Sequence, residues 1–97
     1  MSFTLVIKPE AIKETAEIYA YYKEIDQRLA DRFERGLDTV YREIQRRPER
    51  YAIRKKNYRH LQLKKFPYRV VYALIGQEVV VFQVRHTRRR PSKEYGP

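Results

Sequence analysis

The residues that could do chemistry are concentrated in the second half of the chain, and almost all are basic or aromatic. Arginine side chains can hold a phosphate or a carboxylate through paired hydrogen bonds. The same residue types can cleave RNA when one group activates a 2′-hydroxyl, a cation stabilises the phosphate and an acid protonates the leaving oxygen. The set therefore indicates either anion binding or RNA cleavage. Its members are Arg59, His60, Lys64, Lys65, Arg69, Arg85, His86, Arg88, Arg89, Arg90 and Tyr95.

Arg69 is the strongest single candidate, because it opens a run of apolar residues and so needs an acidic or phosphate partner. The second half of the chain offers only two carboxylates. His60 alternates with Leu61 and Leu63, so it should point away from the sheet face that carries the two leucines. His86 follows the last apolar run, and a histidine titrates near neutral pH. Both histidines are therefore candidates for proton transfer.

Three tyrosines, Tyr58, Tyr68 and Tyr95, could add stacking on nucleic-acid bases. Packing in the core is the more common role of such residues, and we expect it for Tyr68 and Tyr72. The arginines at 88–90 could equally form a basic tail that only keeps the chain in solution. These alternatives stay open on the sequence alone.

The charge of the chain is strongly uneven. The chain has 22 Lys and Arg against 12 Asp and Glu, a net charge of +10. Residues 1–49 hold 9 basic and 10 acidic side chains, whereas residues 50–97 hold 13 basic and 2 acidic ones. Like charges at this density repel one another, so a solvated basic face is a costly arrangement without a partner. The distribution favours an acidic or polyanionic partner.

Several function classes lack the residues that they need. The chain has no cysteine, only three glycines and two histidines, and no nucleophile-elbow, Walker or dinucleotide-binding motif. We therefore expect no metal and no cofactor. The longest apolar run, Val70 to Ile75, is far shorter than the roughly 18 residues of a membrane span, and the first residues lack the basic start of a signal peptide. We expect a cytoplasmic protein that does not contact membranes.

The first half of the chain predicts a short strand followed by two helices. Residues 3–7 are β-prone and end before Pro9, which suits the first turn of a helix. Apolar residues at three- and four-residue spacings predict helices over about 9–24 and 27–46, with Asp26 able to cap the second. The short join predicts an antiparallel hairpin. Gly36 is then either a tolerated defect or a point of close approach between the helices.

The second half predicts strands. Gly76 and Gln77 separate two apolar runs, and glycine at the first loop position favours a type II′ hairpin. Both runs are apolar on both faces, so they should be central strands. The expected segments are a basic loop at 50–57, strands at 58–63, 66–75 and 79–84, and a basic exit segment at 85–97.

Residues 1–97 should form a single domain, because two halves of this length could not each bury a core. The order β-α-α-β-β-β predicts an α+β fold in which a helical hairpin packs on a small antiparallel sheet. The other face of the sheet should be curved and basic.

Two stretches resemble the C-terminal signature of the RelE/ParE superfamily of bacterial toxins: Phe66 to Tyr72 (FPYRVVY) and Val79 to Pro91 (VVVFQVRHTRRRP). The length and the element order are similar over nearly the whole chain. The resemblance implies the toxic half of a type II toxin-antitoxin pair, once called plasmid stabilisation proteins. It also implies an acidic antitoxin as partner, which the charge of +10 would suit.

The RelE-type branch of this superfamily cuts mRNA on the ribosome with two lysines, two arginines and a tyrosine. The resemblance places Arg69, Arg89 and Tyr95 on the arginine and tyrosine positions. His60 and Gln62 stand at the two lysine positions, and His60 could still transfer a proton.

The ParE branch, which poisons DNA gyrase, is more similar in its pattern of strand, histidine, small residue, double arginine and proline, here Val84 to Pro91. Another ribonuclease branch uses a histidine near the position of His86. We therefore expect a growth-arresting, ParE-like inhibitor of DNA gyrase. The alternatives are a RelE-like, ribosome-dependent mRNA endonuclease and a non-toxic relic that only binds its antitoxin. Operator DNA would be bound only through the antitoxin.

Overall fold

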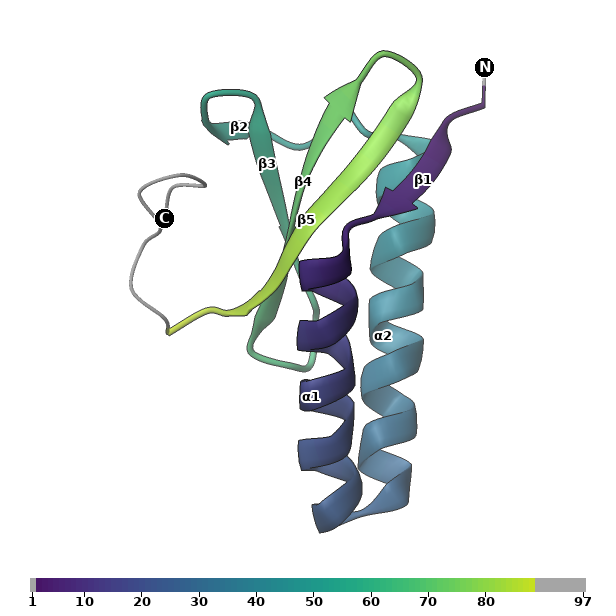
Figure 1. Cartoon of the computed structure of the whole chain (residues 1–97), viewed down its shortest axis with the longest axis vertical. Coiled ribbons are helices and arrows are strands. Elements are labelled where there is room, and N and C mark those ends of the chain that lie inside the picture. Colours follow the sequence, from purple (N-terminus) through teal and green to yellow (C-terminus); the bar gives the residue numbers. More distant parts are fainter. Residues whose placement is uncertain (1, 89–97) are drawn as a thin grey trace.

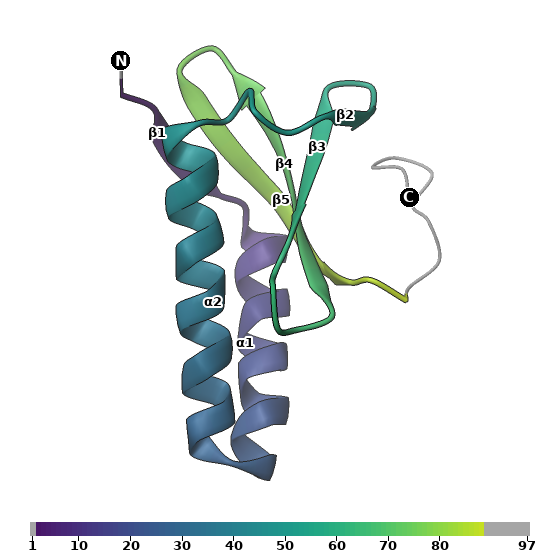
Figure 2. The same cartoon turned by 180° about the vertical axis from the view of Figure 1, so that it is seen from behind.

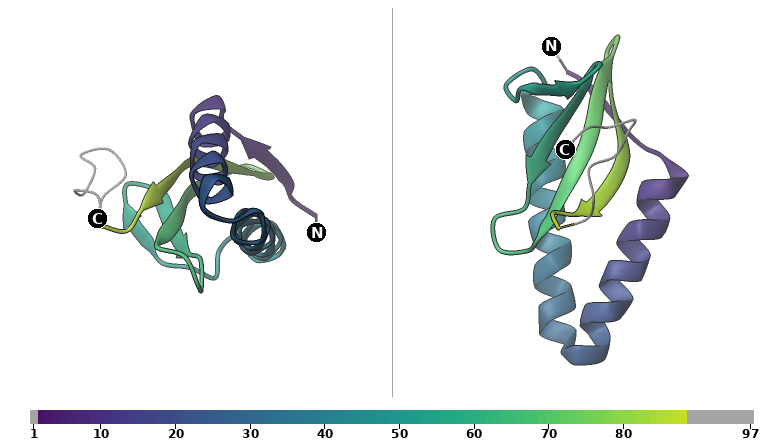
Figure 3. Two further views of the ribbon diagram at one scale, coloured as in Figure 1. Left: turned by 90° about the horizontal axis from the view of Figure 1, so that it is seen from below. Right: turned by 90° about the vertical axis from the view of Figure 1, so that its left-hand side faces the viewer.

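Two antiparallel helices cover one face of a five-stranded sheet (Figures 1 and 2). The structure is a computed structural model, and it describes residues 2–88. The helical hairpin is longer than the sheet, so its closed end extends past the strands (Figure 3). The α+β class, the N-terminal strand and the hairpin on a sheet are therefore confirmed.

Helix α1 spans Pro9–Ile25 and helix α2 spans Gln27–Arg46, close to the predicted ranges. Pro9 begins α1, where its missing N–H costs nothing. Asp26 joins the helices and caps α2, because its carboxylate accepts a hydrogen bond of 2.9 Å from the backbone N–H of Arg28. The predicted cap is confirmed. Within residues 2–88, neither helix has the length and apolar content that crossing a membrane would need.

The sheet has the order β1-β5-β4-β3-β2. The two apolar strands, β4 and β5, are central as expected, because neither has a face that could be left to water. The strands are β1 (Thr4–Ile7), β2 (Ile53–Lys55), β3 (Tyr58–Gln62), β4 (Tyr68–Ile75) and β5 (Glu78–His86).

The sheet differs from the prediction in two ways. Strand β1 pairs with β5 in the parallel direction, so only β2 to β5 form an antiparallel meander. Strand β2 lies in the segment 50–57 that was predicted to be a loop. Its sequence is mostly basic and has little intrinsic tendency to form a strand. It forms a strand because β3 pairs with its backbone in the antiparallel direction.

The core lies between the helices and one face of the sheet. Phe33, Leu37 and Ile44 of α2 pack against Val70 and Tyr72 of β4. Tyr68 packs edge-on against Phe33, with ring centroids 5.7 Å apart, so Tyr68 and Tyr72 are packing residues, as predicted.

Strand alternation puts the neighbours of these core residues on the other face, which we call the second face of the sheet. In β4 these are Arg69, Val71 and Ala73, and in β3 His60 stands opposite Val71. No helix among residues 2–88 covers the second face.

Two glycines have separate roles. Gly76 has φ 63°, the positive value that the first loop position of the β4–β5 hairpin needs. Gly36 is not a point of close approach between the helices. A Cβ atom there would meet Leu63 Cδ2, which follows β3, at an ordinary contact distance of 3.7 Å.

Candidate functional site

His60, Arg69 and Arg85 lie together on the second face. Arg69 stands opposite Arg85 in the β4–β5 pairing, and its Nη1 atom lies 3.5 Å from His60 Nδ1. The Nη2 atom of Arg69 donates a hydrogen bond of 3.3 Å to the carbonyl oxygen of Thr87. His60 is 8% exposed and Arg85 is 4% exposed. The structure thus brings three predicted site residues into one largely buried cationic cluster.

His86 lies on the opposite, helix-facing side of the sheet. It stands opposite Tyr68, and the two rings pack edge-on with centroids 5.2 Å apart. Its Nδ1 atom accepts a hydrogen bond of 3.0 Å from the backbone N–H of Arg88, which fixes the ring at the end of β5. His60 and His86 are therefore not members of one site.

Arg59 is tied to the segment between α2 and β2. Its Nη1 atom donates hydrogen bonds to the backbone carbonyls of Glu49 and Tyr51. The hydroxyl of Tyr72 donates a third hydrogen bond, of 2.8 Å, to the carbonyl of Pro48. These bonds hold the segment against the sheet, so the contacts of Arg59 are structural ones.

Lys64 and Lys65 are exposed in the β3–β4 loop, where they line a groove of about 840 Å³. Helix α2 forms one wall of this groove, and β3 with the β3–β4 loop forms the other. We call it the α2–β3 groove. Its lining residues are Leu29, Arg32, Arg35, Gly36, Thr39, Val40, Glu43, Arg50, Tyr51, Leu61, Gln62, Leu63, Lys64, Lys65 and Phe66.

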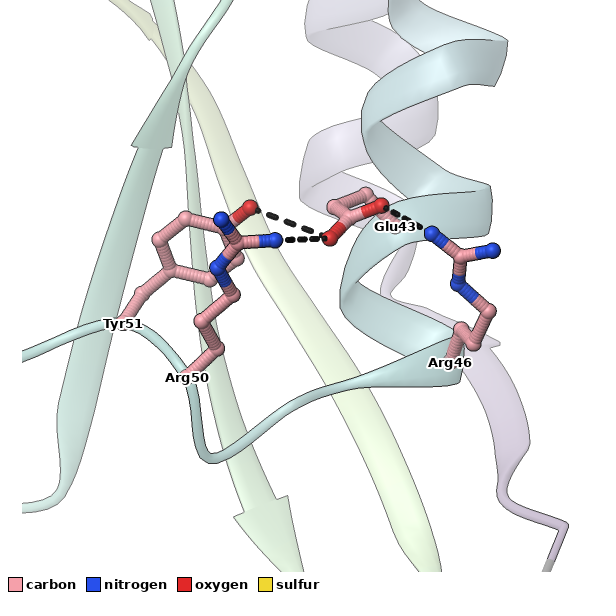
Figure 4. A network of polar contacts seen from close by, with 4 residues as sticks. All are labelled: Glu43, Arg46, Arg50 and Tyr51. Carbon is pink, nitrogen blue, oxygen red and sulfur yellow. Dashed lines mark hydrogen bonds and ion pairs between the residues drawn. The ribbon is translucent and has the colours of Figure 1, made fainter.

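A polar network fixes one end of the groove (Figure 4). The Glu43 carboxylate accepts hydrogen bonds of 3.1 Å from Arg46 and from Arg50, and one of 3.3 Å from the Tyr51 hydroxyl. Loss of hydration would raise the pKa of Glu43, but the two arginines and the tyrosine outweigh it and hold the pKa below its usual value. Glu43 therefore stays ionised and anchors the chain between α2 and β2.

The α2 wall of the groove was not among the predicted site residues, although the sequence carries a signal for it. Arg35 stands three residues after Arg32, Gly36 stands four residues after Arg32, and Thr39 stands four residues after Arg35. A helix therefore places these residues on one face. This basic stripe lies beside the apolar stripe that predicts the helix, and the apolar stripe alone does not reveal it.

The remaining predicted residues divide into two groups. Arg88 is exposed just after β5, whereas Arg89, Arg90 and Tyr95 lie outside the described residues. Within residues 2–88, no three His, Cys, Asp or Glu side chains are grouped so that they could hold a metal ion. The described residues thus offer two basic features, the second-face cluster and the α2–β3 groove, on opposite sides of the sheet.

Comparisons with known proteins agree with this geometry. Residues 5–91 match the family described as the ParE toxin of the type II toxin-antitoxin system, parDE. The chain is 30% identical over 77 residues to Toxin ParE2 of Mycobacterium tuberculosis, in the strains CDC 1551 / Oshkosh and ATCC 25618 / H37Rv. The match covers 78% of this chain and 73% of that protein. A solved structure titled "Chromosomal ParDE TA system from P. aeruginosa" has the same fold, with a TM-score of 0.78 at 16% identity, over 90% of this chain and 98% of that one. The chain therefore belongs to the ParE family of toxins from type II toxin-antitoxin systems, within the RelE/ParE superfamily.

Proposed function

We propose that this chain arrests bacterial growth by binding and inhibiting DNA gyrase, and that a cognate acidic antitoxin neutralises it. The observation that carries the proposal is the family match over residues 5–91, and it is supported by the positions of His60 and His86 on opposite faces of the sheet. Binding of a target needs complementary charge and shape, whereas RNA cleavage needs a base and an acid within reach of one substrate.

The positions of the histidines support binding rather than cleavage. A base and an acid that act on one phosphodiester must lie on the same surface. His60 lies on the second face and is largely buried, while His86 packs against Tyr68 on the helix side.

One observation favours the alternative, a ribosome-dependent mRNA endonuclease of the RelE type. His60 and Arg69 are neighbours on one face, as a proton-transfer group and a phosphate-binding cation should be. In that case Arg89 and Tyr95 would supply the remaining catalytic groups. The variants Arg89→Ala and Tyr95→Phe would then abolish mRNA cleavage. A relic that binds the antitoxin without toxicity is the third candidate, and it predicts normal growth when the chain is expressed alone.

The test compares labelled thymidine and labelled amino acid incorporation in the first minutes after the chain is induced without an antitoxin. We expect DNA synthesis to stop first, with translation intact. Purified chain should then inhibit the supercoiling of relaxed plasmid by purified gyrase. Early loss of translation, with supercoiling unimpaired, would replace the gyrase proposal by the ribonuclease alternative.

A further inference from the structure

The second face of the sheet is buried, although no helix among residues 2–88 covers it. Val71 is fully buried and Arg85 is 4% exposed. The rings of Tyr58 and Phe82, with centroids 5.1 Å apart, account for part of this burial. A sheet face that is open to water leaves an arginine side chain exposed, because a guanidinium group keeps its hydration unless a partner replaces it. The burial therefore indicates a further covering segment.

The charge of the second-face cluster indicates what that segment must carry. Buried guanidinium groups are stable when a carboxylate pairs with them. Residues 50–97 contain two acidic side chains, Glu78 and Glu94. Glu78 begins β5, about 23 Å along the strand from Arg85. The acidic residues of the helices belong to the other side of the sheet, and those of α1 that reach β5 bind its outer edge. Glu94 is therefore the best-placed carboxylate for the cluster.

The end of β5 directs the chain toward the same face. Arg69 holds the carbonyl oxygen of Thr87 through its Nη2 atom, at 3.3 Å. The backbone N–H of Arg88 turns back to His86 Nδ1, at 3.0 Å. The stretch from Arg88 to Glu94 can extend over about 20 Å, whereas neighbouring strands lie about 4.8 Å apart. Glu94 can therefore reach each of the three strands that carry the cluster.

We propose that residues 89–97, which lie outside the described residues, return over the second face, and that Glu94 binds the guanidinium groups of Arg69 and Arg85. The contact is autoinhibitory. The carboxylate takes the place of a phosphate, because both anions accept paired hydrogen bonds from arginine. The cluster then accepts an external phosphate only after the segment has left. This inference goes beyond the proposed function, since it concerns an anion site that gyrase binding does not require.

The chain supplies a matched control for this contact. Glu78 is the other acidic residue of the second half, and it is exposed at the far end of β5. The substitutions Glu94→Gln and Glu78→Gln remove the same charge and keep the shape of the side chain. Thermal unfolding of each full-length variant is measured in inorganic phosphate and in sodium chloride of equal ionic strength, because a ligand that binds the folded chain raises its melting temperature.

We expect phosphate to raise the melting temperature of Glu94→Gln by about 5 °C over the value in chloride. The parent chain and Glu78→Gln should show no such difference, because Glu94 still closes their cluster. Equal responses of the parent chain and Glu94→Gln to phosphate would overturn the proposal.

Urea denaturation tests the pairing itself. Glu94→Gln should raise the equilibrium constant for unfolding by about tenfold, as the loss of a hydrogen bond between charged groups does. The same substitution should have a much smaller effect in a chain that also carries Arg69→Gln, because one of its partners is already gone. An effect of Glu94→Gln that does not depend on Arg69 would count against the proposed contact. Circular dichroism establishes that each variant is folded, and the phosphate measurement does not need the Arg69 variant.

Neither measurement involves gyrase, so the two proposals can fail separately. If the chain inhibits gyrase and Glu94→Gln gains no response to phosphate, the autoinhibitory contact is wrong and the proposed function stands. If Glu94→Gln gains the response and the chain does not inhibit gyrase, the contact stands and the proposed function is wrong.

Discussion

The hydroxyl of Tyr72 offers the sharpest test of how the groove wall is held. Tyr72 is fully buried in β4, and its hydroxyl donates a 2.8 Å hydrogen bond to the carbonyl of Pro48, which is also buried. Burial raises the pKa of Tyr72 above its usual value, so the hydroxyl keeps its proton. Tyr72→Phe removes this donor and leaves the ring in place.

The expected cost comes from the carbonyl that is left in a buried position without its donor. Such a loss amounts to about 1.5 kcal/mol of the free energy of unfolding. In a domain of this size it lowers the melting temperature by about 9 °C. The two hydrogen bonds from Arg59 still hold the neighbouring carbonyls of Glu49 and Tyr51, so the variant should fold.

Urea denaturation followed by circular dichroism measures the change, and its m-value should equal that of the parent chain because the same surface is exposed. Tyr21→Phe is the control, since this side chain is 60% exposed and its hydroxyl can bond to water. The reasoning is refuted if the two substitutions change the midpoint equally.

Other substitutions and conditions test further parts of the structure. Asp26→Ala removes the cap of α2 and should lower stability by about 1 kcal/mol in the same urea assay. Gly36→Ala should raise stability by about 0.5–1 kcal/mol, because the new Cβ meets Leu63 without a clash. Leu63→Ala should cost about 3 kcal/mol, because the side chain is buried in the core cluster, and thermal unfolding would detect it. Burial raises the pKa of both Tyr22 and Tyr41 from 10.0 to about 12. The unfolded chain then holds fewer protons than the folded chain above pH 10, so stability should fall as the pH rises from about 10 to 12, in step with phenolate absorption. A stability that is flat over this range would contradict the burial of both hydroxyls.

The elements could be predicted where the pattern was local. The apolar stripe from Phe33 to Ile44 and the capping residue Asp26 define α2 within one turn of its observed bounds. The alternation around His60 also predicted correctly that this side chain points away from Leu61 and Leu63. In each case a few neighbouring residues carry the information.

The features that the sequence did not predict depend on contacts between distant segments. Strand β2 has a basic sequence and forms because β3 lies beside it, and β1 adds to β5 across most of the chain length. The nearness of His60 to Arg69 requires the β3–β4 register, which no local pattern specifies. The α2–β3 groove arises only when α2 meets the β3–β4 loop, so its basic walls are separate runs in the sequence.

Strand β3 connects the two basic features, and this limits how neutralisation could work. Leu61 points to the groove while its neighbour His60 points to the second face. A partner segment that lies in the groove therefore contacts the strand that carries His60 without covering His60, Arg69 or Arg85. If the toxin's target contacts the helix side of the sheet, a segment in the groove blocks that contact directly. If the target contacts the second face, neutralisation requires another part of the antitoxin to cover that face, because a segment in the groove leaves His60, Arg69 and Arg85 uncovered. In the second case the variant Gly36→Leu, whose new side chain occupies part of the groove, should remain toxic. It should lose only the part of the neutralisation that depends on contacts in the groove.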